Sequence, residues 1–242
     1  MPVNTPPCVL VLAGFDPSGG SGILADADAI RAAGARPVCV PTAFTVQTTR
    51  AVKRWEPVAN ALIQETAHAL LLEENVRGIK IGMICDAKIA KLLFDLLQHR
   101  RDLPIVVDPV LQATSGALLF KGSLQAARDS YLALAHGGIL TPNLAEAQVL
   151  ADGPPDARVL LSKGPKAVLL KGGHLPGDPV DVLATGGTVE EFRAPRIKAN
   201  ARGTGCRLSS AMAAGLARGV GLRDCVLGAR EYVRGYLSRL AP

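Results

Sequence analysis

The residues of this chain that are best suited to chemistry lie in the segment Gly203-Thr204-Gly205-Cys206. An apolar, Ala-rich stretch follows and predicts a helix, whose first turn carries unpaired N–H groups and the positive end of the helix dipole. Because glycine lets the backbone approach a ligand closely, phosphate is a natural ligand of this turn. The helix start also favours the thiolate of Cys206, which becomes a candidate base. An ordinary turn with a buried cysteine is the alternative that the segment alone leaves open.

The elements around this turn predict an α/β fold. Residues 8–14 form a short apolar run that is typical of a buried strand, a glycine-rich loop follows, and residues 23–33 have helical spacing. Apolar runs and helical stretches then alternate, which indicates a central, mostly parallel sheet with helices on both faces in a single domain, residues 1–242. Further strands are expected at 37–40, 78–81, 105–107, 138–140 and 167–170, an antiparallel edge hairpin at 180–184 and 188–193, and helices at 58–72, 87–98, 123–134, 143–151, 205–218 and 223–240.

Composition excludes several classes of protein. The formal net charge is +6, but the basic residues are scattered and do not alternate with aromatic ones, so we expect no nucleic-acid partner. The five cysteines are widely spaced and predict neither a disulfide framework nor a zinc site. No run of about 18 apolar residues predicts a membrane span, and residues 1–7 lack the pattern of a signal peptide. We expect no membrane partner and a cytoplasmic location.

Polar residues and glycines follow the predicted strands. In an open parallel sheet, ligands bind outside the carboxyl ends of the strands, so these positions are the first candidates for a site. They include Gly14 and Asp16, Gly82, Asp108, 141–143, and 171–174, followed by the 203–206 turn.

Six motifs occur in one order along nearly the whole chain. They are Gly14-x-Asp16-Pro17-Ser18-Gly19-Gly20-x-Gly22-Ile23-x-Ala25-Asp26, Lys80-Ile81-Gly82-Met83, Val107-Asp108-Pro109-Val110, Thr141-Pro142-Asn143-x-x-Glu146, Leu170-Lys171-Gly172-Gly173-His174 and Gly203-Thr204-Gly205-Cys206. Together they resemble the motifs of the hydroxymethylpyrimidine and phosphomethylpyrimidine kinases of thiamin biosynthesis, a branch of the ribokinase superfamily. The resemblance implies a ribokinase-like fold, ATP with Mg²⁺, and phosphoryl transfer to a pyrimidine hydroxymethyl group.

Phosphoryl transfer needs a donor-rich anion hole, a metal held by carboxylates, and an acceptor for the proton of the attacking hydroxyl. The backbone of Gly203, Thr204 and Gly205 supplies the first. Asp108 and Glu146 are the candidate Mg²⁺ ligands, with phosphate oxygens and water completing the shell; a turn-forming aspartate and a helix-start glutamate are the alternatives. The resemblance further implies nucleotide contacts from Lys171, Asn143 and Thr204, a solvent-facing side chain being the alternative for Lys171; Arg207 is a further candidate for a nucleotide contact.

The resemblance also implies how the second substrate is recognised. Cys206 stands where sugar kinases of the superfamily carry aspartate, and a thiolate there would accept the hydroxymethyl proton. Gln47 offers a donor and an acceptor to an aminopyrimidine, an exposed loop glutamine being the alternative. By the same resemblance Gly14, Asp26, Met83 and Val110 line the ring pocket. His174 is expected to be structural.

Three features depart from the family pattern. Arg202 stands where histidine is usual, and Arg207 stands where threonine is common. A cation in the first turn of a helix is unfavourable unless it faces an anion, so we hypothesise that one of these arginines contacts phosphate, a solvent-facing side chain being the alternative. The chain is also short between Glu146 and Lys171, where only a helix at 157–162 is expected.

The favoured function is therefore an ATP-dependent kinase of 4-amino-5-hydroxymethyl-2-methylpyrimidine and of its monophosphate. Pyridoxal or pyridoxine kinase is the alternative enzyme, because its substrate is also a flat heteroaromatic ring with a hydroxymethyl arm. A pseudokinase that senses pyrimidine or nucleotide is a third reading, suggested by Arg202 and Arg207. The resemblance alone implies a homodimer.

Overall fold

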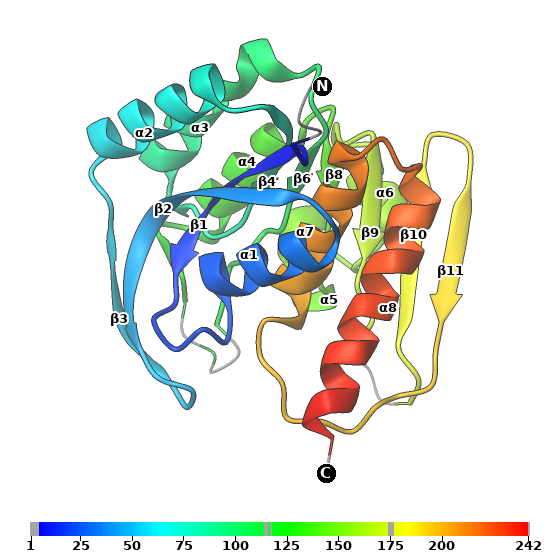
Figure 1. The fold of residues 1–242 in the computed structure, drawn as a ribbon. Coiled ribbons are helices and arrows are strands. Elements are labelled where there is room, and N and C mark those ends of the chain that lie inside the picture. The colour runs from blue at the N-terminus through cyan, green and yellow to red at the C-terminus, as the bar shows by residue number, and fades with distance from the viewer. Residues whose placement is uncertain (1–4, 114–115, 117, 174–176, 242) are drawn as a thin grey trace.

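The computed structural model describes residues 5–113, 116, 118–173 and 177–241. Within them, nine strands form one sheet in the order β11-β10-β9-β8-β6-β4-β1-β2-β3 (Figure 1). The strands from β2 to β9 in this order are parallel, and antiparallel partners extend both edges. The strands are β1 (Cys8–Phe15), β2 (Arg36–Gln47), β3 (Val52–Pro57), β4 (Val76–Ile81), β6 (Ile105–Val107), β8 (Ile139–Leu140), β9 (Ala167–Leu170), β10 (Val180–Thr185) and β11 (Val189–Arg193); β5 (Cys85–Asp86) and β7 (Phe120–Lys121) form a separate pair.

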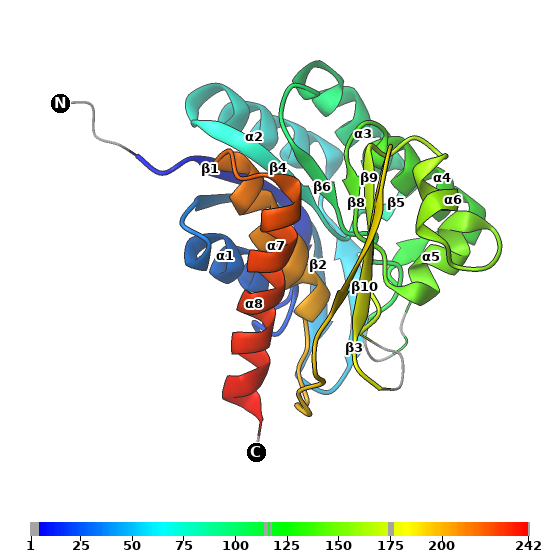
Figure 2. The same cartoon turned by 90° about the vertical axis from the view of Figure 1, so that its right-hand side faces the viewer.

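Helices cover both faces of the sheet, as the alternating pattern predicts (Figure 2). Successive residues of β1 divide between two apolar clusters: Leu10 and Leu12 belong to one, and Val9 and Val11 to the other. The first cluster lies under α2 (Asn60–Glu73), α3 (Ala87–Leu97), α4 (Leu124–Ala135), α5 (Leu144–Ala151) and α6 (Ala157–Leu161), and the second under α1 (Gly22–Ala32), α7 (Thr204–Ala217) and α8 (Leu222–Leu240); a short 3₁₀ turn, η1 (Gln98–Arg100), follows α3. No helix in the described parts of the chain has the length and apolarity of a membrane span.

The sequence predicts the helices to within two residues at each end and identifies the β10–β11 hairpin, but it misses β3, β5, β7 and the full length of β2. The expected strand at 37–40 continues to Gln47. Pro41 lies at a register shift, where Thr42 is inserted before Ala43 pairs with Gly14. A bulge tolerates a proline inside a strand, so Pro41 does not end β2. The extension then pairs with β3 and carries Gln47 to the end of a strand rather than into a loop.

Local sequence explains several helix starts. Asn143 caps α5, because its side chain accepts from the amide of Glu146 while the Glu146 carboxylate accepts from the amide of Asn143. Asp86 caps α3 and Ser123 caps α4 through a side-chain oxygen alone, without the reciprocal bond. α7 begins differently, since its N-cap is Gly203 in the left-handed region, φ 66°, with no side-chain cap. The first amides of α7 are therefore left for another acceptor.

Candidate active site

A cavity of about 800 Å³ collects the residues that follow the strands. Its lining runs from the β2 end to α8 and includes all but two of the predicted site residues. The predicted residues among its walls are Gly14, Gln47, Met83, Asp108, Val110, Asn143, Glu146, Lys171, Gly203, Thr204, Gly205 and Cys206; Asp26 and Arg207 are not among them. His174 lies outside the described residues.

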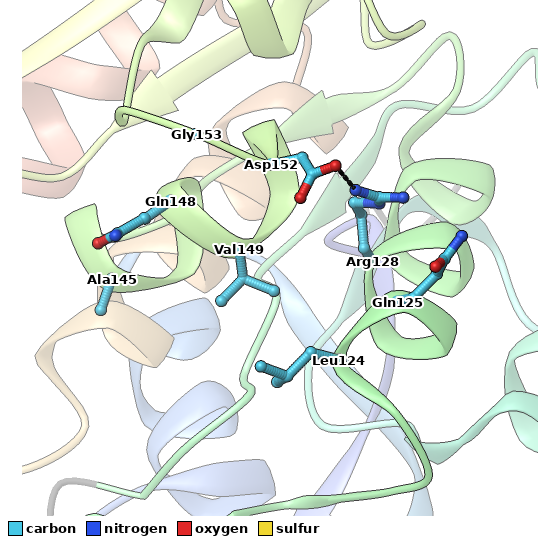
Figure 3. Close-up of a pocket in the computed structure, with 8 residues that line it drawn as sticks. All are labelled: Leu124, Gln125, Arg128, Ala145, Gln148, Val149, Asp152 and Gly153. Carbon is cyan, nitrogen blue, oxygen red and sulfur yellow. Dashed lines mark ion pairs between the residues drawn. The ribbon is translucent and has the colours of Figure 1, made fainter.

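A second hollow of about 420 Å³ lies between α4 and α5 (Figure 3). Its walls carry an ion pair between Arg128 and Asp152, 2.6 Å apart, with Leu124 and Val149 beside it. It contains none of the predicted catalytic side chains. The residues with catalytic potential therefore lie on the larger cavity.

The glycine turn before α7 packs backbone against backbone on the loop after β1. A Cβ at Gly203 would lie 2.3 Å from the carbonyl oxygen of Gly20, and a Cβ at Gly22 would lie 2.3 Å from that of Gly14. Both glycines also have positive φ, 66° and 58°. The two loops can approach this closely only because Gly203 has no side chain, and the lack of one at Gly22 lets the β1–α1 loop fold back on the end of β1.

Lys171 and Asp108 form an ion pair at the cavity wall. Nζ of Lys171 donates to Oδ1 of Asp108 at 2.6 Å; the Asp108 side chain is buried and that of Lys171 is partly exposed to the cavity. A Cβ at Gly205 would lie 3.0 Å from the same Nζ, so the glycine lets the ammonium reach the first turn of α7. Burial raises the pKa of Asp108, but Lys171 and Lys80 outweigh it and hold this pKa below its ordinary value.

Glu146 is the second carboxylate of the cluster. Burial, together with the charge of Asp108, raises the pKa of Glu146 to about 7, although Lys171 opposes the shift. Burial has the opposite effect on Lys171 and lowers its pKa, but the charges of Asp108 and Glu146 outweigh burial and raise this pKa above its usual value. Two acids thus face one lysine, and the cluster carries an excess of negative charge when all three groups are ionised.

Cys206 differs from its prediction. Its residue borders the cavity, but burial raises the pKa of its thiol to about 12, and the charges of Asp26 and Asp108 add to this while Lys80 opposes it. The predicted stabilisation of the thiolate by the helix start is therefore wrong for the ligand-free protein. The dipole contributes about 0.3–1 kcal/mol, whereas desolvation of a charge costs several kcal/mol.

Asp26 is fully buried rather than part of the cavity wall. It accepts from Nζ of Lys80 at 2.8 Å and from Oγ of Ser210 at 2.8 Å, and the Lys80 and Asp26 side chains are 0% exposed. Burial raises the pKa of Asp26, and Lys80 opposes that shift. The sequence offered a signal for this pair, because Lys80 is a charged residue between the apolar residues Ile79 and Ile81 of the strand.

Arg207 is also placed differently from its prediction. The residue is 5% exposed, its Nη1 donates to the carbonyl of Gly20 at 3.0 Å, and its guanidinium lies 4.1 Å from the ring centroid of Tyr236. It therefore joins the β1–α1 loop to α8. The hypothesis of a phosphate contact is corrected here for Arg207, whose cation faces a carbonyl and an aromatic ring.

Asp16 anchors the β1–α1 loop, a role that the motif alone did not reveal. Its carboxylate accepts from the backbone N and Oγ of Ser18 at 2.8 and 2.6 Å, and from the backbone N and Oγ of Ser21 at 2.9 and 2.8 Å. Burial alone raises the pKa of Asp16, but these hydrogen bonds and Arg202 hold it below the ordinary value.

The far end of the cavity contains residues that sequence reasoning did not select. Asp181 of β10 forms an ion pair with Arg230 of α8 and accepts from the amide of Gly172 at 2.9 Å. Since Gly172 follows Lys171 directly, this pair ties α8 to the strand end that holds the lysine. Val233 and Leu237 add an apolar wall on α8.

Comparison with known proteins identifies the family. The model of the phosphomethylpyrimidine kinase family matches residues 16–241. This chain belongs to that family. A hydroxymethylpyrimidine/phosphomethylpyrimidine kinase of Streptomyces coelicolor is 38% identical over 248 residues, which cover 98% of this chain and 91% of the relative. The predicted family and the ribokinase-like α/β fold are thus confirmed.

Solved structures agree on the fold. The phosphomethylpyrimidine kinase of Clostridium difficile 630 is 32% identical, with a TM-score of 0.81 and coverage of 96% of this chain and 99% of that one. The pyridoxal kinase of Bacillus subtilis, solved as an ADP complex, is 25% identical with the same TM-score of 0.81 over 94% and 90% of the two chains. The backbone alone therefore does not separate the two substrate classes, whereas sequence identity favours the pyrimidine kinases.

Proposed function

We propose that this kinase transfers the γ-phosphoryl group of ATP to the hydroxymethyl group of 4-amino-5-hydroxymethyl-2-methylpyrimidine, and then to the resulting monophosphate. The observation that carries the proposal is the meeting of the uncapped α7 start with the Lys171–Asp108 pair and Cys206 on one cavity wall. Amides without an internal partner, a cation and a proton-transferring group are the parts that phosphoryl transfer requires.

The ends of the cavity divide between the two substrates. Gln47, Met83 and Val110 stand at the β2 side, where an amide between apolar walls suits a small aromatic ring. Thr204, Asn143 and Lys171 stand on the side that leads to α8, where we place the nucleotide phosphates. The ADP complex of the Bacillus subtilis pyridoxal kinase supports nucleotide use on this fold.

The residues present fit a magnesium ion that is shared with phosphate. Within the described parts of the chain, no three His, Cys, Asp or Glu side chains are placed to hold a metal by themselves. One or two carboxylates suffice for Mg²⁺ when phosphate and water oxygens complete its shell. Glu146 and Asp108 would hold the ion; each also accepts a hydrogen bond within the protein, Glu146 from the amide of Asn143 and Asp108 from Lys171. When bound, the ion would neutralise charge on the phosphates.

Cys206 enters the reaction as a thiol in this proposal. Its hydrogen bond to Asp108 helps to hold the pKa of that carboxylate down. The substrate hydroxyl passes its proton to Sγ as the phosphorus–oxygen bond forms, while the thiol proton moves to Asp108. A weak acceptor suffices because the transition state of phosphoryl transfer is loose.

Substitution of Cys206 separates this relay from a thiolate base. A serine can accept and donate a proton at once, so we expect Cys206→Ser to retain at least tenfold more kcat on the alcohol than Cys206→Ala. The second phosphorylation starts from a phosphate and needs no strong base, so Cys206→Ala should damage the first step more. Equal loss in the serine and alanine variants would contradict the relay, and equal loss in both steps would contradict the division between them.

A coupled ADP-release assay tests the function itself. We expect turnover with hydroxymethylpyrimidine and its monophosphate, and a lower kcat/KM with pyridoxal. A higher kcat/KM with pyridoxal would establish the alternative enzyme, which the similar TM-scores of the two kinds of kinase keep in view. Binding of the pyrimidine without any ADP release would indicate a sensor. Light scattering on the same sample tests the proposed homodimer.

A further inference from the structure

Arg202 joins three segments that surround the β2 end of the cavity. Its Nη2 donates to Oε1 of Gln47 at 3.0 Å, and its Nη1 donates to the carbonyl of Thr48 at 2.8 Å and to Oγ of Ser18 at 3.4 Å. The carboxylate of Asp16 lies 3.7 Å from Nη2. The side chain is 19% exposed and lines the cavity. One guanidinium thus connects the glycine turn, the β2 end and the β1–α1 loop.

This contact decides how the Gln47 amide is turned. A guanidinium has N–H donors and no acceptor, so the atom of Gln47 that faces it must be the carbonyl oxygen Oε1. The amide nitrogen Nε2 is then left to donate elsewhere. Turning the amide over would place two donors against each other and would lose a charge-assisted hydrogen bond.

The charge of Arg202 is used within the protein rather than for phosphate. Asp16, whose pKa is lowered by its hydrogen bonds from Ser18 and Ser21, carries the opposing negative charge. The donors of Arg202 meet a side-chain amide, a backbone carbonyl and a hydroxyl. The surroundings of Lys171 are different, because the charges of two carboxylates, Asp108 and Glu146, act on it.

We infer that Arg202 is a positioning residue that fixes the Gln47 amide with Nε2 available to the substrate ring, and so selects a ring with a hydrogen-bond acceptor at that point. The inference rests on the proposed function. An aminopyrimidine meets the requirement, because its ring nitrogen accepts from Nε2 and its neighbouring amine donates to the second lone pair of Oε1. Pyridoxal has a ring nitrogen without an adjacent amine and satisfies only half of the pair.

A double-mutant cycle on Arg202 and Gln47 tests the inference. We expect Arg202→Ala to raise the KM and the calorimetric Kd for hydroxymethylpyrimidine about tenfold, with the KM for ATP changed by less than twofold. In the Gln47→Ala background, Arg202→Ala should raise the KM and the Kd for hydroxymethylpyrimidine by less than a further twofold. Arg202→Lys, which keeps the charge and one donor, should recover part of the loss. Arg54→Ala is the matched control. Arg54 lies in β3, which pairs with the strand that ends at Gln47, and its 65% exposed side chain pairs with Glu56.

The outcomes separate the inference from the function on which it rests. An equal rise in KM and Kd with Gln47 present or absent would overturn the positioning role while leaving the kinase activity standing, as would a rise in the KM for ATP instead. If Arg202→Ala fails to fold, the cycle is run with Arg202→Met, which keeps the length of the side chain but removes its donors, and the same criteria apply. If the wild type binds no pyrimidine in the calorimeter, both the proposed function and the inference fall.

Discussion

The structure contains two buried lysine–aspartate pairs close to Cys206, and they differ in what else their charges meet. Lys80 and Asp26, 2.8 Å apart, are fully buried, and Ser210 occupies the other oxygen of Asp26. Lys171 and Asp108, 2.6 Å apart, line the cavity with side chains 11% and 3% exposed, and a second acid, Glu146, acts on the same lysine. The first pair is balanced in charge, whereas the second has one acid too many.

The imbalance indicates where a ligand belongs. A buried balanced pair holds its elements together, and Lys80–Asp26 ties β4 to α1 and, through Ser210, to α7. Burial, and after it the charge of Asp108, raises the pKa of Glu146, so a proton or an added cation would neutralise the excess negative charge of the Lys171 cluster. We therefore assign a structural role to the Lys80–Asp26 pair and a functional role to the Lys171–Asp108 pair.

The largest expected effect is on stability at the balanced pair. Lys80→Met leaves Asp26 buried without its cation, which should lower the free energy of unfolding by about 3–5 kcal/mol. Urea denaturation measures this loss. The double variant Lys80→Met/Asp26→Leu should recover much of it, because no charge then stays unpaired. A single variant within about 1 kcal/mol of the wild type would contradict the structural role.

Removal of the other lysine should act on catalysis instead. We expect Lys171→Met to lower kcat by about 10²–10³-fold, because a cation beside the reacting phosphates is lost, while stability falls less than in Lys80→Met. Steady-state kinetics and urea denaturation on one preparation measure both. Lys166→Met is the matched control, since Lys166 is exposed and directly precedes the same strand, β9. An unchanged kcat in Lys171→Met would contradict a functional role for the Lys171–Asp108 pair.

The smallest expected effect is a dependence of stability on pH. Glu146 keeps its proton to about pH 7 in the folded protein, whereas the unfolded chain releases it near 4.5. The folded state binds more protons in this window, so stability falls as pH rises from about 4.5 to 7, by on the order of 1–3 kcal/mol. Glu146→Gln retains the acceptor for the Asn143 amide and should lose this slope. Identical slopes for the wild type and the variant would show that Glu146 does not carry the excess charge.

Much of the fold and of the cavity lining could be predicted from sequence because both follow from local pattern. The apolar run before Asp108 or Lys171 shows a strand, and parallel strands end at one edge, so their next residues converge. The errors arise where a distant residue decides. Asp26 is held by Lys80, 54 positions away, and Arg207 by Gly20, 187 positions away. The pKa of the Cys206 thiol is another such error, because the effect of the helix start can be predicted from local sequence but burial by distant residues cannot.

The contact of Gly203 with Gly20 bears on when this protein becomes competent to bind. The nine strands of the main sheet all end by Arg193, whereas Gly203, Gly205 and the first amides of α7 follow that point. The strand ends alone therefore do not bind an anion, and the binding turn is complete only once α7 has docked onto the β1–α1 loop.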